Sequence, residues 1–458
     1  MKNSLKVWKE FTKCGKMKSD LIKKQIIGSE IMDYSIKYET ISEGVELCSV
    51  SAAGFKTACV SVSMVMPLCE KASEYALLPH LLCSSSEQYP DLTSIEKKLA
   101  VLYGATVSGN VTKIGEKQVL NLDISCIDDR FALDGESITE ECSKLLFELI
   151  FRPRIDNGAF LVSETEREKR ILSESLAAET SDKRQYAKNR CEEIMCKDEA
   201  YGINSFGRSE WIENATAESV YKAYKEVMES CRMYVTVCGG NSENIKSVLF
   251  GYIQKIDRKP QSAETLFVES AEDVEYAKET EQVKQGKLVM GFRMGMKNPE
   301  DNYAARRVMV DMFGGSPHSK LFMNVREKMS LCYYCSARMI GQKGVMFVQS
   351  GIESANEEKA KNAILQQLED IRNGEFTADD MEYSVKALED GFRTVSDSPE
   401  ALVNWYSLQF VNETRYTPEN YIDAFRGVTR EQVIQAAKDV TLDTVFMLEG
   451  NAEGGAEE

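Results

Sequence analysis

Histidine is almost missing from the sequence, which has only two, His80 and His318, among 458 residues. No run approaches the roughly 18 apolar residues of a membrane-spanning helix. The first residues are rich in lysine but lack the apolar segment of a secretory signal. Positive charge is also in deficit, since the net charge is −17 and non-specific nucleic-acid binding requires a positive surface. We therefore expect neither a nucleic acid nor a membrane among the partners.

The rest of the composition is that of a folded protein. Apolar residues make up 43% and charged residues 28% of a chain that is long enough for two or more domains. The 13 cysteines are odd in number and scattered, unlike those of a small disulfide scaffold. We therefore expect reduced thiols and a cytoplasmic location.

Composition and patterning divide the chain into five parts. Residues 1–32 are lysine-rich and weakly patterned, so they are either a flexible basic extension or sequence upstream of a start at Met32. Residues 256–283 are acidic and poorly periodic, as in a linker. The predicted parts are a basic extension, a first module, an acidic linker, a second module and a polar tail, at residues 1–32, 33–255, 256–283, 284–450 and 451–458.

The two modules look like one unit used twice. In the first, the strand patterns KTACVSVSMVM and KQVLNLDISCID lie on either side of a helix-and-strand stretch, SIEKKLAVLYGATVSG. In the second, the corresponding stretches are GKLVMGFRMGM, GVMFVQSGIES and SKLFMNVREKMSLCYYCSA, roughly 225 residues later. This order predicts an α+β fold with two domains of similar shape.

Two stretches resemble a known family. ALLPHLLCSSSEQYPDLTSIEKKLAVLYGATVSG is similar to the zinc-site region of the pitrilysin/insulinase metalloproteases, which carry an inverted H-x-x-E-H motif on a helix. GGSPHSKLFMNVREKMSLCYY resembles the signature of that family's second domain. The resemblance covers residue 38 to about residue 450. It implies two homologous modules, each a mostly antiparallel sheet covered by helices, joined by a linker into half of a clamshell.

Within the family, the chain looks most like a bacterial subgroup of non-catalytic homologues. The resemblance implies an association with a modification of elongation factor P. It also implies that an active paralogue occurs beside the chain as its partner in a heterodimer. No cofactor motif for a hydroxylation or a reduction is visible in the residues themselves.

The zinc motif is degenerate in this chain. By the resemblance, Ala76 replaces the first histidine, Pro79 replaces the glutamate that takes a proton from zinc-bound water, and His80 keeps the second histidine. Glu174 stands at the family's third ligand, and Cys83 lies one helical turn from His80. We therefore expect no catalytic residue, metal or cofactor here. We expect His80 to be partly buried with a hydrogen-bond partner, and Glu174 to be solvated.

A second pair of family residues is intact. Arg326 and Tyr333 stand seven residues apart, and the resemblance implies that such a pair binds substrate across a closed chamber. Arginine can hold a carbonyl or a carboxylate, and tyrosine can donate to an oxyanion. In two-subunit members, one subunit supplies the zinc motif and the other supplies this pair. The alternative is structural, with Arg326 paired to local acids and Tyr333 packed in a strand.

A C-x-x-C motif overlaps this region. Cys332 and Cys335 fall in a predicted strand, whereas redox motifs of this kind begin a helix. Residues three apart on a strand point to opposite faces, so the two thiols are not expected to meet. We therefore expect no redox chemistry from them.

Three functions remain open. The first is a non-catalytic subunit that contributes Arg326 and Tyr333 to a peptide or protein substrate, while the zinc sits in an active paralogue. The second is a binding or scaffolding protein that encloses a peptide or client without cleaving it. The third is a stand-alone zinc peptidase with altered ligands, and the loss of the base argues against it.

Overall fold

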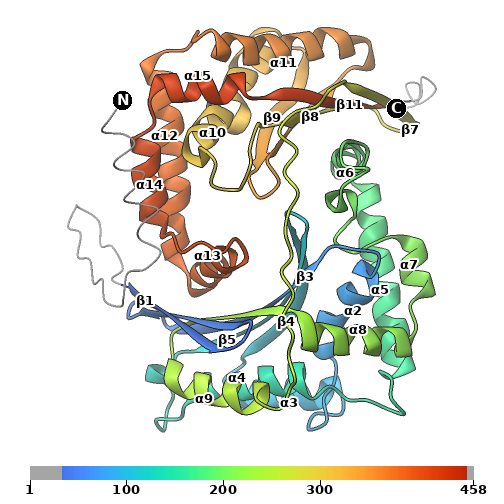
Figure 1. Ribbon diagram of the computed structural model, residues 1–458, viewed down its shortest axis with the longest axis vertical. Coiled ribbons are helices and arrows are strands. Elements are labelled where there is room, and N and C mark those ends of the chain that lie inside the picture. Colours follow the sequence, from blue (N-terminus) through green and yellow to red (C-terminus); the bar gives the residue numbers. More distant parts are fainter. Residues whose placement is uncertain (1–33, 451–458) are drawn as a thin grey trace.

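The computed structural model describes residues 34–450, so the basic extension and the polar tail expected from the sequence lie outside the described residues. The chain forms two halves, each built on one β-sheet, with the first half below the second in Figure 1. None of the described helices combines the length and the apolar character that crossing a bilayer requires.

The first half is built on a six-stranded sheet in the order β1-β2-β6-β3-β5-β4, in which β2 and β6 run parallel and the other neighbours antiparallel. The strands are β1 (Tyr34–Ser42), β2 (Val45–Ala52), β3 (Thr57–Pro67), β4 (Thr106–Ile114), β5 (Lys117–Ile127) and β6 (Arg232–Cys238). The helices are α2 (Ala72–Leu82), α3 (Leu92–Val101), α4 (Ile138–Phe151), α5 (Val162–Ser181), α6 (Lys183–Met195), α7 (Ser209–Asn214), α8 (Ala217–Ser230) and α9 (Ser242–Ile253).

The second half is built on a five-stranded sheet in the order β7-β11-β8-β10-β9, in which β7 and β11 run parallel and the rest antiparallel. The strands are β7 (Glu275–Glu281), β8 (Gly286–Arg293), β9 (Cys332–Ile340), β10 (Val345–Ile352) and β11 (Thr441–Gly450). The helices are α10 (Tyr303–Val310), the π-helical turns η4 (Asp311–Gly315) and η5 (Leu321–Lys328), α11 (Glu357–Arg372), α12 (Ala378–Arg393), α13 (Pro399–Val411), α14 (Pro418–Arg426) and α15 (Arg430–Lys438).

The two sheets repeat one topology. The order β2-β6-β3-β5-β4 corresponds strand by strand to β7-β11-β8-β10-β9, with a parallel first pair and antiparallel pairs after it. The first sheet adds β1 at its edge. The predicted α+β fold of two similar units with mostly antiparallel sheets is therefore confirmed.

The segment that we expected to be a linker has two parts. Residues 256–274 form neither helix nor strand. Residues Glu275–Glu281 form β7, which pairs in parallel with β11 and occupies the place that β2 has in the first sheet. The second unit of the repeat therefore begins inside the segment that the composition marked as a linker.

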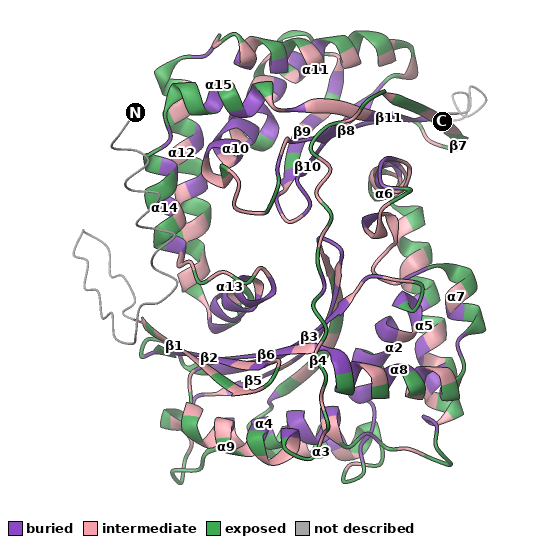
Figure 2. Ribbon diagram, in the orientation of Figure 1, coloured by how far each residue is buried: buried purple, intermediate pink, exposed green. Residues whose placement is uncertain are grey.

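Helix α13 of the second half covers part of the first sheet (Figure 1). Leu402, Tyr406 and Phe410, spaced at about one turn, pack on the face of that sheet which its own helices leave open. The ring of Phe410 stacks on Tyr234 of β6, with centroids 4.9 Å apart. α13 is buried over most of its length for this reason (Figure 2).

Helix α6 of the first half covers part of the second sheet in return (Figure 1). Cys191 and Met195 of α6 join a buried cluster with Val289, Phe347 and Phe446 of the second sheet. The two halves therefore exchange one helix each, and each exchanged helix completes the apolar packing of the opposite half.

A buried chain of ion pairs joins the halves beside α6. Lys343, with no exposed surface, bonds through Nζ to Glu116 Oε1 and to Glu199 Oε2, each at 2.5 Å. Glu199 also pairs with Arg293 of β8 at 2.7 Å, and Arg293 pairs with Asp443 of β11 at 2.7 Å. Glu116 and Glu199 belong to the first half, whereas Lys343 and Arg293 belong to the second. Their ion pairs therefore hold the two halves together here.

Removing the buried lysine tests this connection. Lys343→Ala should lower the free energy of unfolding by about 3–5 kcal/mol, because it leaves two buried carboxylates without this partner. Lys144→Ala breaks an exposed pair with Glu140 on α4 and should cost at most about 1 kcal/mol. Urea denaturation measures both changes. Equal urea midpoints for the two variants would contradict the role of Lys343.

Acid should weaken the contact between the halves. Burial alone would raise the pKa of Glu199, but hydrogen bonds from Arg293 and Lys343 outweigh it and hold the pKa below the ordinary 4.5. A carboxyl with a depressed pKa contributes stability that is present above its unfolded pKa and lost as the pH falls below it. Thermal melts below about pH 4.5 should therefore decline less steeply for Glu199→Gln than for the wild type. Glu174→Gln, at an exposed position, should follow the wild type; a Glu199→Gln profile that also does so would refute the idea.

Candidate functional site

Helix α2, which carries the degenerate zinc motif, packs as an ordinary core helix. Ala76 and Pro79 are both buried. The backbone of β4 lies directly on Pro79, since a Cβ added at Gly109 would come within 2.5 Å of the Pro79 carbonyl oxygen. The position of the family's general base is therefore a proline pressed against a strand, and proline has no group that accepts a proton.

His80 is exposed although Leu81 and Leu82, which complete α2, are buried; this corrects the expectation of a partly buried side chain with a hydrogen-bond partner. Its carbonyl accepts a hydrogen bond from the Ser84 hydroxyl at 2.9 Å, but its imidazole makes no hydrogen bond or ion pair with a described residue. Burial raises the pKa of the nearby Cys83 thiol to about 12. Cys83 therefore stays protonated at neutral pH and is a poor candidate for a metal ligand.

Glu174 is placed on the solvent side of α5. Its side chain is 71% exposed and makes a distant ion pair with Arg170, 3.8 Å from Nε to Oε1. The buried stripe of α5 runs instead through Glu168 and Leu172, and half-buried Ser175 continues it. Glu174 therefore points away from the buried face of α5.

The residues on α2 and α5 do not fit the family's zinc ion. A catalytic zinc site takes three protein ligands and one open position. In residues 34–450, no group of three or more histidine, cysteine, aspartate or glutamate side chains is placed to hold a metal. The described residues of α2 and α5 therefore do not provide the ligands of the family's catalytic zinc.

A β-bulge turns Tyr333 toward solvent. In the pairing of β9 with β10, Tyr334 lies opposite Gly351 and Cys332 lies opposite Ile352, so Tyr333 is the additional residue. Its side chain is 65% exposed. Without the bulge, the alternation of the strand would place Tyr333 on the same buried face as Cys335.

The same bulge overturns the expectation for the two cysteines of the C-x-x-C motif. Cys332 and Cys335 are both buried on the face of β9 that packs against the helices of the second half. A hydrogen bond with the Cys335 thiol lowers the pKa of Cys332, and the pKa of Cys335 is raised in turn. The two thiols are therefore neighbours. In a regular strand, residues 332 and 335 would point to opposite faces, but the additional residue in the bulge puts both cysteines on the buried face.

Arg326 lies on η5, the π-helical turn that precedes β9. Its guanidinium is over the ring of Phe322, 4.5 Å from the centroid, and its Nε is 3.6 Å from Glu327 Oε1. The side chain is 39% exposed and makes no closer ion pair within the described residues. Both Arg326 and Tyr333 adjoin Cys332, so the pair occupies one region at the edge of the second sheet.

The zinc-motif positions and the arginine–tyrosine pair belong to different halves. α2 packs against α5, α8 and β4 of the first half. η5 and β9 are elements of the second half and pack on one another. Within this chain, the structure does not combine the two sets of residues into one site.

A cleft beside β9 was not foreseen from the sequence. It has a volume of about 230 Å³ between the start of α6 and strands β9 and β10. Arg184 of α6 stacks on Tyr334, 4.3 Å from the ring centroid, and bonds to Gln349 at 2.9 Å. Arg338 lines the same cleft. The residues are about 150 positions apart, so no local motif could have grouped them.

Comparisons with known proteins give one consistent family. Residues 214–388 match the family model described as "Peptidase M16 inactive domain". A Bacillus subtilis (strain 168) protein named "Probable inactive metalloprotease YmfF" is 30% identical over 421 residues, which cover 92% of this chain and 99% of that protein.

Solved structures agree on the fold. A conserved protein from Enterococcus faecalis V583 is 27% identical with a TM-score of 0.85, over 92% of this chain and all (100%) of that one. A peptidase M16 inactive domain from Pseudomonas fluorescens has a TM-score of 0.74 at 14% identity, over 91% of this chain and 98% of that one. By these matches over nearly its whole length, the chain belongs to the M16 (pitrilysin/insulinase) family of metallopeptidases, as one of its inactive homologues.

Proposed function

We propose that this chain is the non-catalytic member of a pair of M16-type subunits. In the pair, an active paralogue holds the zinc, and this chain presents Arg326 and Tyr333 to the peptide substrate. The observation that carries the proposal is the β-bulge that turns Tyr333 to solvent beside the partly exposed Arg326. A purely structural role would be better served by burying both side chains.

The chemistry of the pair suits a substrate held by another subunit. A guanidinium donates two parallel hydrogen bonds to a peptide carbonyl or a terminal carboxylate and so orients the chain. A phenol donates to the oxygen that becomes negative when water attacks the carbonyl. Neither group needs a metal in the same chain. This agrees with Ala76 and Pro79, which stand where the family has a zinc-binding histidine and the glutamate base.

The thiols and the family resemblance suggest a cellular setting for the pair. All twelve cysteines of residues 34–450 are free thiols, which supports a cytoplasmic location. The family resemblance makes elongation factor P the first protein to test as a client of the pair. The net charge of −17 argues against a nucleic acid as the ligand, and Arg326 and Tyr333 suit a peptide or protein.

Substitution of the pair should lower turnover by the complex with its active paralogue. Arg326→Ala should reduce kcat/KM roughly 10- to 150-fold, because it removes hydrogen bonds from a charged donor. Tyr333→Phe should reduce kcat about 10²-fold, because it removes one donor to the oxyanion. Peptide cleavage by the purified complex measures both, with complex formation checked by size-exclusion chromatography.

Two variants of matched chemistry serve as controls. Arg393→Ala on α12 and Tyr276→Phe on β7 alter similarly exposed residues away from β9 and should leave turnover unchanged. Unchanged turnover for both Arg326→Ala and Tyr333→Phe would refute the proposal. Failure of the chain to form a complex with the paralogue would contradict the subunit function and favour the binding or scaffolding function.

The isolated chain should behave as a protein without zinc. Incubation with 1,10-phenanthroline should leave its melting temperature unchanged, and His80→Ala should change stability by no more than about 0.5 kcal/mol, since the imidazole is exposed and makes no bond. The complex with the active paralogue, in contrast, should lose peptidase activity in the chelator. Stoichiometric zinc in the isolated chain, measured by mass spectrometry of the metal, would contradict this expectation.

A further inference from the structure

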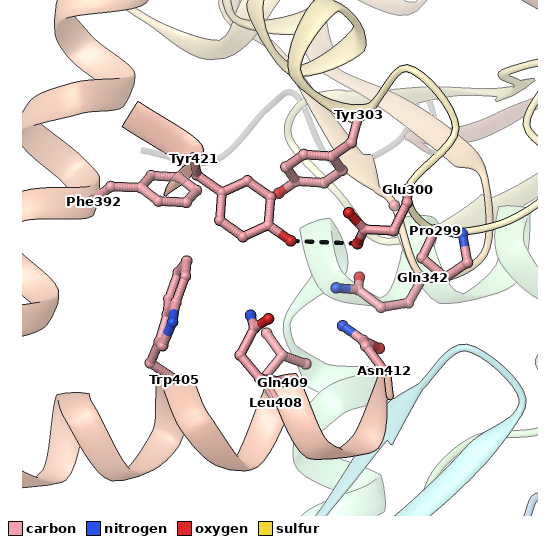
Figure 3. A pocket seen from close by; sticks show the side chains of 11 residues that line it. Pro299, Glu300, Tyr303, Gln342, Phe392, Trp405, Leu408, Gln409, Asn412 and Tyr421 are labelled. Atoms are coloured by element: carbon pink, nitrogen blue, oxygen red, sulfur yellow. Dashed lines mark hydrogen bonds between the residues drawn. The ribbon is translucent and has the colours of Figure 1, made fainter. Parts of the chain in front are cut away.

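A small cavity lies in the second half, beside the turn that follows β9 and so at the opposite end of that strand from Tyr333. It has a volume of about 40 Å³ and lies between the loop before α10, the β9–β10 turn and helices α12, α13 and α14 (Figure 3). Four aromatic side chains from four different segments line it, namely Tyr303, Phe392, Trp405 and Tyr421. Nothing in the proposed subunit function uses this cavity.

Glu300 is the one ionisable acid among the residues that line the cavity. Its Oε1 accepts a hydrogen bond from the Tyr421 hydroxyl at 3.4 Å, as the dashed line in Figure 3 shows. It forms no ion pair with any residue in 34–450. Burial raises its pKa, and the Tyr421 hydroxyl only partly offsets this. The carboxylate is thus half-buried without a cation to balance it, an arrangement that disfavours the charged form unless a ligand supplies the positive charge.

The aromatic rings around Glu300 are held rigidly. Trp405 and Tyr421 meet edge to face at 5.6 Å and 85°, and Phe392 meets Trp405 at 5.3 Å and 77°. The indole N–H of Trp405 donates to the Tyr416 carbonyl at 2.9 Å, which fixes the orientation of the indole. Aromatic faces attract cations within about 6 Å, most strongly where water is excluded. A ring wall beside an uncompensated carboxylate is therefore suited to a cation.

The remaining polar groups are neutral amides. Gln342 of the β9–β10 turn and Asn412 at the end of α13 lie near one another on one side of the cavity (Figure 3). Their carbonyl oxygens are acceptors for the N–H groups that an ammonium ion carries in excess. An anion would be repelled by Glu300, and an apolar molecule would bury the carboxylate further with no balancing charge.

We propose that this cavity binds a primary alkylammonium group, with Glu300 as the counter-charge and the aromatic rings as the surrounding wall. A water occupies about 10–15 Å³ on the same measure, so the cavity holds an ammonium with its adjoining methylenes but not a whole amino acid. Two sources share this chemistry, the side chain of a lysine in a peptide and a small free amine.

The test uses the full chain and two probes that differ in charge. n-Butylammonium should bind in ligand-observed NMR titrations, and n-butanol, its neutral counterpart, should not. Glu300→Gln keeps an oxygen acceptor but removes the charge, and it should weaken n-butylammonium binding at least tenfold. Asp423→Asn removes a charge from the same helix as Tyr421 outside the cavity lining and should leave binding unchanged.

The binding measurements distinguish an ammonium site from a neutral cavity. Equal binding of n-butanol and n-butylammonium, or unaltered binding of n-butylammonium by Glu300→Gln, would overturn the proposal, and the comparison of probes needs no variant at all. Binding of Nα-acetyl-lysine amide more tightly than n-butylammonium would support the site and identify a lysine side chain as its source. Tighter binding of n-butylammonium than of Nα-acetyl-lysine amide would support the site and identify a small free amine as its ligand. None of these measurements needs a second subunit, so they stand or fall independently of the proposed pairing.

Discussion

The reciprocal exchange of α6 and α13 is the constraint on which the rest of the structure depends. A sheet has two faces, and the helices of each half cover only one of them. β3 shows the consequence, because Val60 and Val62 face the helices of their own half while Cys59 and Val65 face α13. β3 is therefore buried almost from end to end, and its apolar content exceeds what a one-sided sheet would need. Neither half can complete its packing without a helix of the other half.

This packing limits where a ligand can be held. One face of each sheet is covered by its own helices and part of the other face by the exchanged helix, so the places left for a ligand include sheet edges, helix ends and the seams between elements. β9 is at an edge, and its bulge moves Tyr333 outward while Cys332 and Cys335 stay in the core. In the first half, Ala76 and Pro79 place apolar groups in the core at the positions that correspond to the family's zinc motif. The zinc positions could change without damage to the packing, because small apolar residues satisfy a buried helix face better than unpaired ligands do.

The sequence predicted what depends on local periodicity and on family motifs. The repeated strand patterns and the α+β class followed from alternation that survives in both halves. β7 was missed because EYAKETE is charged, and an exposed edge strand needs no apolar face to pair with β11. His80 was expected to be partly buried because α2 reads as apolar, but its side chain is on the exposed side of the helix although Pro79 and Leu81 are buried. The two cysteines were misjudged because a bulge cannot be read from alternation, and the clefts join residues too distant in the chain for any motif.

α13 shows how the exchanged packing and the small cavity are related. Leu402, Tyr406 and Phe410 form the stripe that rests on the first sheet, whereas Trp405, Leu408, Gln409 and Asn412 form the adjacent stripe that lines the cavity. The two stripes follow the same helical period on one rigid element. A group that enters the cavity therefore contacts the helix that holds the two halves together. Because every residue that lines the cavity belongs to the second half, the cavity lies where α13 meets the rest of its own half, while the adjacent stripe of the same helix rests on the first sheet.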